Sequence, residues 1–468
     1  MDIFSWQHIN KVYLFTIVLV SLSLGYLSIQ KGHDWGGDFA LYIDQAQALK
    51  NGTLDKLYEQ NKFTVEHSDI ATLSPYLYPN GFPLLLTPFN TASPDYYWLK
   101  LYALVFFGFL ILVIYLFFNQ ISKNKFLVLF ITACIAFHFE FFLHLDQIYA
   151  DIPFTLFSFL SFYLIHKQKK KGYLQYILIG LCIGLAYLIR TNGIFLIPTL
   201  LAYQLLNPNK ERWVTKATPY IIFSLFFLTN QLTTVNYESN YLSMLSITNF
   251  STIKSNLNYY LAIISKYPFG SFDDLSFSVS ILQLLVVLPL CTYGFYKNWR
   301  KMLPFAVFVT LNLALYIIWP SKQGLRFLFP IMPIIIGLFA LGIYHLPFKR
   351  LKYGFMVLCL GLVCYNSLNK LSEHRQISTN ECLTKDTKEL YTYIKQNTDK
   401  NAIFNFKKPR VLRHFTGRNA VVQKTYNLNV PQIWGYLITN TETDIENQEL
   451  ELVFRNNSFI AYKLKQYY

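Results

Sequence analysis

Two aspartates stand where a carboxylate could act as an acid or a base at the start of a helix. Asp38 follows the pair Gly36-Gly37 and precedes an amphipathic pattern with apolar positions at Ala40, Leu41, Ile43, Ala46 and Leu49. We expect this helix at the membrane surface. Its first turn would project the Asp38 carboxylate, which could accept a proton from a hydroxyl group. The alternative is a helix N-cap, because Asp is a preferred capping residue, and both interpretations can hold together.

The second aspartate, Asp151, lies in the short segment LHLDQIYADIP, directly before an apolar run. Here too a cap is the alternative, with Asp146 of the same segment simply solvated. An acidic residue at the edge of a membrane bundle is functional more often than one on a soluble helix. We therefore predict Asp151 as the second carboxylate of a site.

Three cations are expected on the same face as these carboxylates. Arg190 ends an apolar run, and Lys322 and Arg326 lie in the segment WPSKQGLRFLFP. Arginine forms paired hydrogen bonds with phosphate oxygens. The alternative for each cation is snorkelling toward lipid headgroups. The combination of carboxylates and cations favours a site that binds an anionic group.

The sequence gives weaker support for a metal site or a nucleotide-binding site than for a site that binds an anionic group. His138, Glu140 and His144 could form a metal site, but their loose spacing favours an interfacial polar cluster. There is no P-loop, no GxGxxG after a predicted strand and no Asp-x-Asp pair. We predict no resident cofactor, with a divalent metal ion as the alternative. The basic residues come in short bursts rather than in one patch, so nucleic acid is not expected as a partner.

The composition indicates that these residues belong to a membrane protein. The 468 residues are 53% hydrophobic and only 14% charged, against about 25% charged in a soluble domain. Eleven apolar runs are candidate membrane-spanning helices, two of them short. The runs are Val12–Ile29, Leu101–Phe118, Phe126–Leu143, Ile152–Ile165, Tyr173–Ile189, Gly193–Leu206, Ala217–Val235, Val279–Tyr296, Met302–Trp319, Phe327–Leu346 and Tyr353–Leu368.

The Lys and Arg residues predict an orientation. With the N-terminus in the cytoplasm, 16 of the 26 basic residues before residue 369 fall inside, and every inside loop is positive, as the positive-inside rule requires. Of the 16 acidic residues in this part of the chain, 13 fall outside. We therefore predict a multi-pass protein of the cytoplasmic membrane, in contact with its lipids. The large loops, about 30–100 and 236–278, and the C-terminus would be periplasmic or extracellular.

Two domains are predicted. Residues 1–368 form an all-α membrane domain whose first outer loop, 30–100, carries the predicted site. Residues 369–468 hold 25 of the 67 charged residues and form a small soluble domain outside the membrane. An α/β fold is indicated there by a helical pattern at 385–396, short apolar segments at 402–406 and 419–422, and a hairpin-like stretch at 450–464.

Five segments carry a resemblance to a known family. They read GGDFALYIDQAQAL, YLYPNGFPLLLTPF, LDQIYADIPF, IRTNGIFLIP and KQGLRFLFPIMP. In this order, over about residues 1–345, they resemble membrane glycosyltransferases of the GT-C fold. The closest are family 39 and its bacterial relatives, which include protein O-mannosyltransferases and the aminoarabinose transferase of lipid A. The resemblance implies an enzyme that takes a sugar from a polyprenyl phosphate.

The resemblance also implies roles for the candidate residues. Asp38 matches the first-loop catalytic acid, Asp151 the second-loop acid, and Arg326 the basic residue near the lipid phosphate. Asp38 would accept the proton of an acceptor hydroxyl while Asp151 orients the sugar or the acceptor. Arg326, with Lys322 or Arg190, would stabilise the departing phosphate. A single displacement would invert the anomeric centre.

Two segments depart from the family pattern. Asp38-Phe39 stands where many relatives carry an acidic pair, and Gln323-Gly324-Leu325 stands where a His or Glu often lies next to the Arg. Metal use therefore stays open, as does the acceptor: a lipid, a glycan or a protein. Two other functions stay open as well. One is a flippase or transporter of lipid-linked sugars, and the other is a polysaccharide polymerase or ligase that uses a lipid-diphosphate donor.

Overall fold

The chain divides into two compact units, which are described separately. The computed structural model describes residues 3–70, 73, 75–89, 95–167, 172–208, 212–233, 245, 248–270, 277–322, 324–377, 380–424, 432–442, 445 and 447–465. The first unit comprises Met1–Ile29, Lys100–Thr233 and Ile247–Ile377. The second comprises Gln30–Leu99, Thr234–Ser246 and Ser378–Tyr468. The first outer loop therefore clusters with the C-terminal residues.

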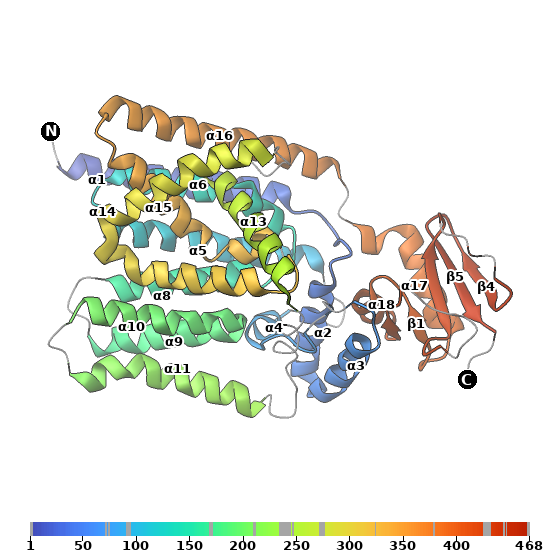
Figure 1. Ribbon diagram of the computed structural model, residues 1–468. Coiled ribbons are helices and arrows are strands. Elements are labelled where there is room, and N and C mark those ends of the chain that lie inside the picture. The colour runs from blue at the N-terminus through green and yellow to red at the C-terminus, as the bar shows by residue number, and fades with distance from the viewer. Residues whose placement is uncertain are drawn as a thin grey trace. The chain divides into compact units, whose positions relative to one another are not determined.

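The first unit consists of helices, four of which (α8 to α11) run along one another in Figure 1. Each of the eleven predicted apolar runs falls largely on helical residues. The helices are α1 (Ile3–Ser28), α5 (Tyr96–Ile121), α6 (Lys125–Ala136), α7 (Phe139–Leu145), α8 (Asp151–His166), α9 (Tyr173–Ile189), η1 (Thr191–Phe195), α10 (Leu196–Leu206), α11 (Trp213–Thr233), α13 (Phe250–Lys266), η2 (Tyr267–Phe269), α14 (Phe277–Ile318), η3 (Leu325–Leu328), α15 (Met332–Tyr344) and α16 (Lys349–Gln376).

The helices differ from the predicted runs in the following places. The predicted run 126–143 is broken into α6 and α7, which meet at 44°. His138 has an extended backbone at the break, and its side chain accepts a hydrogen bond from the Glu140 N–H as a cap. The predicted loop between the runs 279–296 and 302–319 is a kink within α14, centred on Asn298. Helix α16 continues to Gln376, beyond its predicted end at Leu368.

The number of membrane crossings stays a prediction. Among the described residues, four helices are long and apolar enough to cross a membrane, or five if the bent pair α6–α7 is one span. Shorter apolar helices of 10–17 residues make up much of the remaining bundle: Asp151–His166, Tyr173–Ile189, Thr191–Leu206 and Met332–Tyr344. The chain is thus a multi-pass membrane protein by its apolar helices. Part of the predicted second outer loop, 236–278, lies outside the described residues, at 236–244, 246–247 and 271–276.

The second unit combines three helices of the first outer loop with a small α/β assembly. The loop helices are α2 (Gly37–Asn51), α3 (Leu54–Glu66) and α4 (Gly81–Leu86). The sheet is mixed, in the order β2-β1-β3-β5-β4, with β1 parallel to its two neighbours and the other pairs antiparallel. Its elements, drawn in orange to red in Figure 1, are α17 (Lys385–Asn397), β1 (Ile403–Asn405), α18 (Pro409–Thr416), β2 (Asn419–Val421), β3 (Tyr436–Asn440), β4 (Leu450–Arg455) and β5 (Phe459–Leu464).

The predicted small C-terminal sheet is confirmed. The sequence patterns missed one strand of the sheet and one helix that packs against it. The patterns at 385–396, 402–406, 419–422 and 450–464 correspond to α17, β1, β2 and the antiparallel pair β4–β5. The missed elements are β3, the central strand of the sheet, and the short helix α18. A core of Leu390, Ile394, Phe404, Leu412 and Ala461 joins the two helices to the sheet.

Helix α2 is more deeply buried than the sequence pattern indicates. Eight of its residues, among them Phe39, Leu41 and Gln45, are buried, so the apolar stripe is not one-sided. The helix packs against α3, α4 and α18, which cover it on several sides. The prediction of a one-sided amphipathic helix is therefore wrong, because residues on more than one face of α2 are buried in protein.

Candidate active site

Asp38 lies in the first turn of α2, in the second unit. The N-cap of this helix is Gly36, which has no side-chain cap, so Asp38 is not the capping residue. Asp34 Oδ1 instead accepts a hydrogen bond from the Gly36 N–H, at 2.8 Å, and this turn leads the chain into the helix. The Asp38 side chain therefore makes contacts other than a helix cap.

One of the contacts of Asp38 is with Tyr78. The Tyr78 hydroxyl donates a hydrogen bond to Asp38 Oδ1, at 2.6 Å. Burial raises the pKa of Tyr78 well above 10, and the nearby Asp38 carboxylate adds to this shift. The phenol therefore keeps its proton at neutral pH and remains a donor.

The main chain of Tyr78 is held by α2 itself. Gln45, two turns after Asp38, accepts a hydrogen bond from the Tyr78 N–H at 3.0 Å and donates to the Tyr78 carbonyl at 2.7 Å. The Tyr78 ring also stacks on Tyr42, with ring centres 4.2 Å apart. One helix thus carries both the carboxylate and the groups that fix its hydrogen-bond donor.

Asp151 lies in the first unit and is the first residue of α8. Its N-cap neighbour is Ala150, which makes no side-chain cap. Asp151 is 2% exposed and forms an ion pair with Arg190 at the end of α9. A buried carboxylate is stable when a cation pairs with it. The sequence therefore located Asp151 correctly at a helix start, but its partner there is a cation rather than the helix backbone.

Arg190 and Arg326 flank the same aromatic ring. Their guanidinium carbons lie 5.2 and 5.9 Å from the centre of Phe327. Arg326 also lies 5.1 Å from the ring centre of Tyr149, in the segment just before Asp151. Cation–π contacts of this length hold a guanidinium in place without neutralising its charge. Two of the three predicted cations are thus brought together, with Asp151 bound to one of them.

Polar side chains adjoin this group, and the sequence did not single them out. Asn192 Nδ2 lies 3.3 Å from both Asn312 Oδ1 and the Tyr316 hydroxyl, and Tyr316 donates to Asn312 at 2.8 Å. The Tyr316 ring lies 5.0 Å from that of Phe327. The signal for Asn192 was its place in the segment IRTNGIFLIP, two residues after Arg190.

Lys322, the third predicted cation, has a different aromatic neighbour. Its Nζ atom lies 5.3 Å from the centre of the Tyr259 ring on α13. The neighbouring residue Gln323, one of the departures from the family pattern, lies outside the described residues. Lys322 thus shares no ring with the two arginines in the contacts described.

Asp146 is buried, so the alternative interpretation in which it is simply solvated is wrong. Its carboxylate lies 2.7 Å from Lys100 Nζ and 3.1 Å from His374 Nε2, and Asp146 and Lys100 are fully buried. His374 belongs to the extension of α16 that the sequence did not predict. A lysine within the apolar segment YYWLKLYALV is a signal that could have revealed Lys100, because ionisable groups in membrane helices usually have a buried partner.

The candidate metal residues do not form a cluster. His144 Nδ1 lies 3.9 Å from Glu140 Oε2, and His138 caps α7. Within the part of the chain that the structure describes, no three His, Cys, Asp or Glu side chains are close enough to hold a metal ion.

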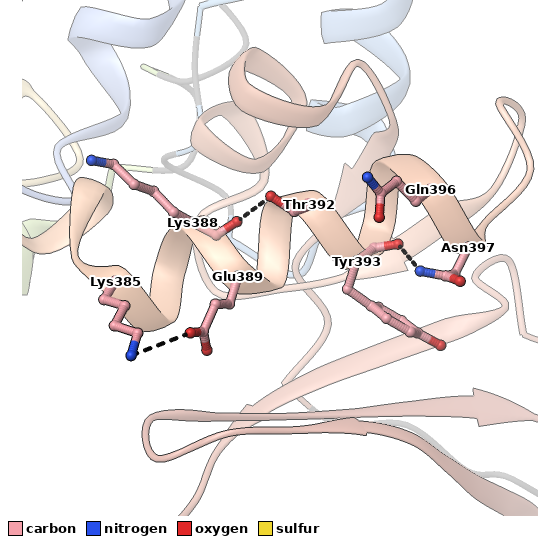
Figure 2. Close-up of a pocket in the computed structure, with 7 residues that line it drawn as sticks. All are labelled: Lys385, Lys388, Glu389, Thr392, Tyr393, Gln396 and Asn397. Carbon is pink, nitrogen blue, oxygen red and sulfur yellow. Dashed lines mark hydrogen bonds and ion pairs between the residues drawn. The ribbon is translucent and has the colours of Figure 1, made fainter.

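A hollow on the second unit contains none of the candidate residues. Figure 2 shows that its lining comes from one helix, α17: Lys385, Lys388, Glu389, Thr392, Tyr393, Gln396 and Asn397. Lys385 and Glu389 form an exposed ion pair at 4.0 Å. Tyr393 packs on Phe454 of β4, with ring centres 4.9 Å apart. These are ordinary surface contacts.

The fold defines the class of the protein. The chain has the GT-C fold of membrane glycosyltransferases, as structural likeness over almost its whole length shows. Residues 98–235 match the profile of the family described as dolichyl-phosphate-mannose-protein mannosyltransferase. No curated protein matches the sequence significantly.

Three solved structures illustrate this likeness, each at 10% sequence identity. ArnT from Cupriavidus metallidurans, in a crystal structure bound to undecaprenyl phosphate, matches with a TM-score of 0.56 over 98% of both chains. Its apo form matches with a TM-score of 0.58 over 97% of this chain and 98% of ArnT. The mycobacterial arabinofuranosyltransferase AftD, solved by electron cryomicroscopy, matches with a TM-score of 0.54 over 97% of this chain and 41% of AftD.

Proposed function

We propose that this protein is a membrane glycosyltransferase that moves a sugar from a polyprenyl phosphate to a hydroxyl group of a lipid, glycan or protein. The observation that carries the proposal is the pair Arg190 and Arg326 around Phe327, with Asp151 bound to Arg190. The fold is shared with ArnT, a protein crystallised with undecaprenyl phosphate. A lipid phosphate therefore fits both the fold and the charge of the group.

The two arginines would bind the phosphate of the donor. Each guanidinium offers hydrogen bonds in a planar fork that matches phosphate oxygens. Asp151 holds Arg190 at the end of α9, so we assign it a positioning role rather than a direct contact with the proton that moves. As the bond between the anomeric carbon and the phosphate oxygen breaks, negative charge grows on the phosphate, and fixed cations stabilise it. Lys322 would serve as a more distant cation.

Asp38 would act as the general base. The acceptor hydroxyl loses its proton to the Asp38 carboxylate as its oxygen attacks the anomeric carbon. The electron pair of the broken bond leaves with the polyprenyl phosphate, which is a stable anion and needs no proton. One carboxyl group therefore suffices, unlike in glycosidases, and the anomeric configuration inverts. Tyr78 would hold the Asp38 carboxylate in place through its hydrogen bond.

We further propose that the reaction takes place on the outer face of the cytoplasmic membrane, with eleven crossings and a cytoplasmic N-terminus. The charge distribution of the loops supports this orientation. A reporter fused after Tyr468 tests it directly. A fusion that is active only outside the cytoplasm is expected, whereas one active only in the cytoplasm would overturn the orientation and the location of the second unit.

Product analysis tests the function. The purified protein would be incubated with a panel of polyprenyl-phosphate sugars and with membrane extracts as the acceptor source. The expected product is polyprenyl monophosphate, released together with a glycosylated acceptor. Release of polyprenyl diphosphate would instead identify a polymerase or ligase. Movement of the intact donor across vesicles without release of its sugar would identify a flippase.

A further inference from the structure

Helix α18, in the C-terminal part of the chain, contacts the helix that carries Asp38. It packs against α2 and α3 within the second unit. Three of its polar side chains are almost fully buried although it has only eight residues: Arg410 and Arg413 are 3% and 4% exposed, and the side chain of His414 is 7% exposed. Buried charged and polar side chains need partners. Those of α18 find them in the first outer loop.

His414 is bound at both ring nitrogens. Nδ1 lies 2.6 Å from Asp44 Oδ1, six residues after Asp38 on α2. Nε2 lies 2.9 Å from the hydroxyl of Tyr96, whose side chain is itself buried. These two contacts fix both the ring plane of His414 and the rotation of α2 about its own axis.

The residue next to Asp38 is held by the same rings. Phe39 is fully buried and stacks on His33, with ring centres 3.8 Å apart. The rings of Tyr96 and His414 meet it edge-on at 5.7 and 6.0 Å. A rotation of the first turn of α2 would break all three contacts, so this packing restricts the direction in which Asp38 points.

Arg410 holds the segment that carries Tyr78. Its Nη2 donates to the Pro75 carbonyl at 2.7 Å, and its Nε donates to Asn61 Oδ1 at 3.2 Å. Asn61 in turn donates to the carbonyls of Pro75 and Tyr76. The aliphatic part of Arg410 lies on Gly37, where the β-carbon of a larger residue would sit 3.8 Å from Arg410 Cδ. Arg410 therefore contacts both the residue before Asp38 and the segment that leads to Tyr78.

We propose that Arg410 and His414 are positioning residues of the transferase site, so that the C-terminal part of the chain is required for the chemistry and is not an appended domain. The inference rests on the proposed function of Asp38 as the base. His414 sets the orientation of α2, and Arg410 sets the position of the Tyr78 segment. Neither residue needs to touch the substrate.

The matched control is Arg418, another buried arginine of the same domain, 8% exposed. The hydrogen bonds of its guanidinium go to main-chain carbonyls of Lys395, Thr398 and Thr416, all in the C-terminal segment. Arg418→Met would therefore disturb this segment without removing a contact to the first outer loop. A purely structural role of the buried polar groups predicts the same behaviour for all three residues.

The experiment compares His414→Gln, Arg410→Lys and Arg418→Met in the full-length protein. It measures kcat, the KM for the polyprenyl-phosphate donor, the thermal midpoint and the hydrogen exchange of residues 37–51. We expect kcat of the first two variants to fall about 10- to 100-fold, because small misplacement of a catalytic group has effects of this size. The donor KM should change less than about two-fold, because the proposed phosphate residues are untouched. Exchange of residues 37–51 should increase, and Arg418→Met should keep both its kcat and this exchange pattern.

The inference would be overturned if His414→Gln and Arg410→Lys lowered kcat no more than Arg418→Met does, or if exchange of residues 37–51 did not change. The exchange measurement needs no activity, so it tests the positioning role even if the wild-type protein transfers no sugar from any donor. That last result would contradict the proposed function instead. If His414→Gln fails to fold, Asp44→Ala and Tyr96→Phe remove the two His414 contacts one at a time and take its place. If Arg410→Lys fails to fold, Asn61→Ala removes the acceptor of Arg410 Nε and takes its place.

Discussion

The two carboxylates that the sequence singled out have opposite partners. Asp38 is partly buried and accepts a hydrogen bond from Tyr78, a phenol whose pKa is raised by burial. Asp151 is 2% exposed and forms an ion pair with Arg190. A phenol donates a hydrogen bond without cancelling the charge of the carboxylate, whereas a guanidinium compensates that charge. The comparison teaches that two aspartates at similar positions, each at the start of a helix, can differ in chemical role because their hydrogen-bond or ion-pair partners differ.

The chemistry of these partners supports the proposed roles. A carboxylate whose charge is compensated by a buried cation is a weak proton acceptor, so Asp151 suits the orientation of Arg190. Asp38 suits proton transfer. Asp146 extends the series, because it is fully buried between Lys100 and His374. The contacts of Asp146 connect α5, α7 and α16, which indicates a structural role.

The largest expected effect is that of Asp38→Asn. The amide keeps the shape of the side chain but cannot accept a proton, and losing a general base costs about 10²- to 10⁴-fold in rate. The thermal midpoint should stay close to that of the wild type, because the amide oxygen can still accept the hydrogen bond from the Tyr78 hydroxyl. Transfer rates and thermal unfolding of the two proteins check this. Turnover within a few-fold of the wild type would exclude Asp38 as the base and remove the contrast with Asp151.

The main expected effect of Asp151→Asn is a lower stability of the folded protein. Removing one partner of a buried ion pair costs about 3–5 kcal/mol, because Arg190 is left without its carboxylate. A phosphate that binds Arg190 would replace part of the lost charge, so added polyprenyl phosphate should raise the thermal midpoint of this variant more than that of the wild type. An equal lipid-induced shift in both proteins would show that Arg190 does not meet the phosphate.

Arg326→Lys should lower transfer by roughly 10- to 100-fold. The lysine keeps the charge but loses the planar fork, and a hydrogen bond to a charged group contributes about 1.5–3 kcal/mol. Arg326→Ala should lower transfer further. Lys322→Ala is the matched control, since the aromatic ring that Lys322 contacts is that of Tyr259, and its loss should be tolerated better. Equal transfer by all three variants would reduce Arg326 to an anchor in the headgroup region.

Tyr78→Phe should have the smallest effect. The ring and its stacking on Tyr42 remain, and only the hydrogen bond to Asp38 is lost. A single hydrogen bond contributes about 1 kcal/mol, so a loss of about five-fold in kcat is expected, with the donor KM unchanged. Steady-state kinetics at several donor concentrations separate the two constants. A change confined to KM would place Tyr78 at the substrate rather than behind Asp38.

The local features of the site could be predicted from the sequence. The start of α2 next to Asp38 and the start of α8 at Asp151 follow from short patterns of apolar and acidic residues. The apolar runs predicted the helices of the first unit because helix periodicity and length are local properties. The strands β1, β2, β4 and β5 were predicted for the same reason, as each has a compact apolar segment.

The partners could not be predicted, because they come from distant parts of the chain. Tyr78 lies 40 residues from Asp38, and His374 lies 228 residues from Asp146. No sequence pattern links such pairs. The helix α18 was missed because its sequence, PRVLRHFT, is short and half polar, although packing buries its arginines. The bend before α7 and the kink at Asn298 likewise depend on tertiary contacts that override helix propensity.

Donor binding by Asp38→Asn and Arg326→Ala tests most directly the claim that one group moves the proton while the other holds the phosphate. Both variants and the wild type would be titrated with the same polyprenyl phosphate, and their transfer rates would be measured in the same preparation. Asp38→Asn is expected to bind the lipid with wild-type affinity while losing transfer, and Arg326→Ala is expected to lose affinity. Weakened binding by Asp38→Asn, or unchanged binding by Arg326→Ala, would contradict this division of roles.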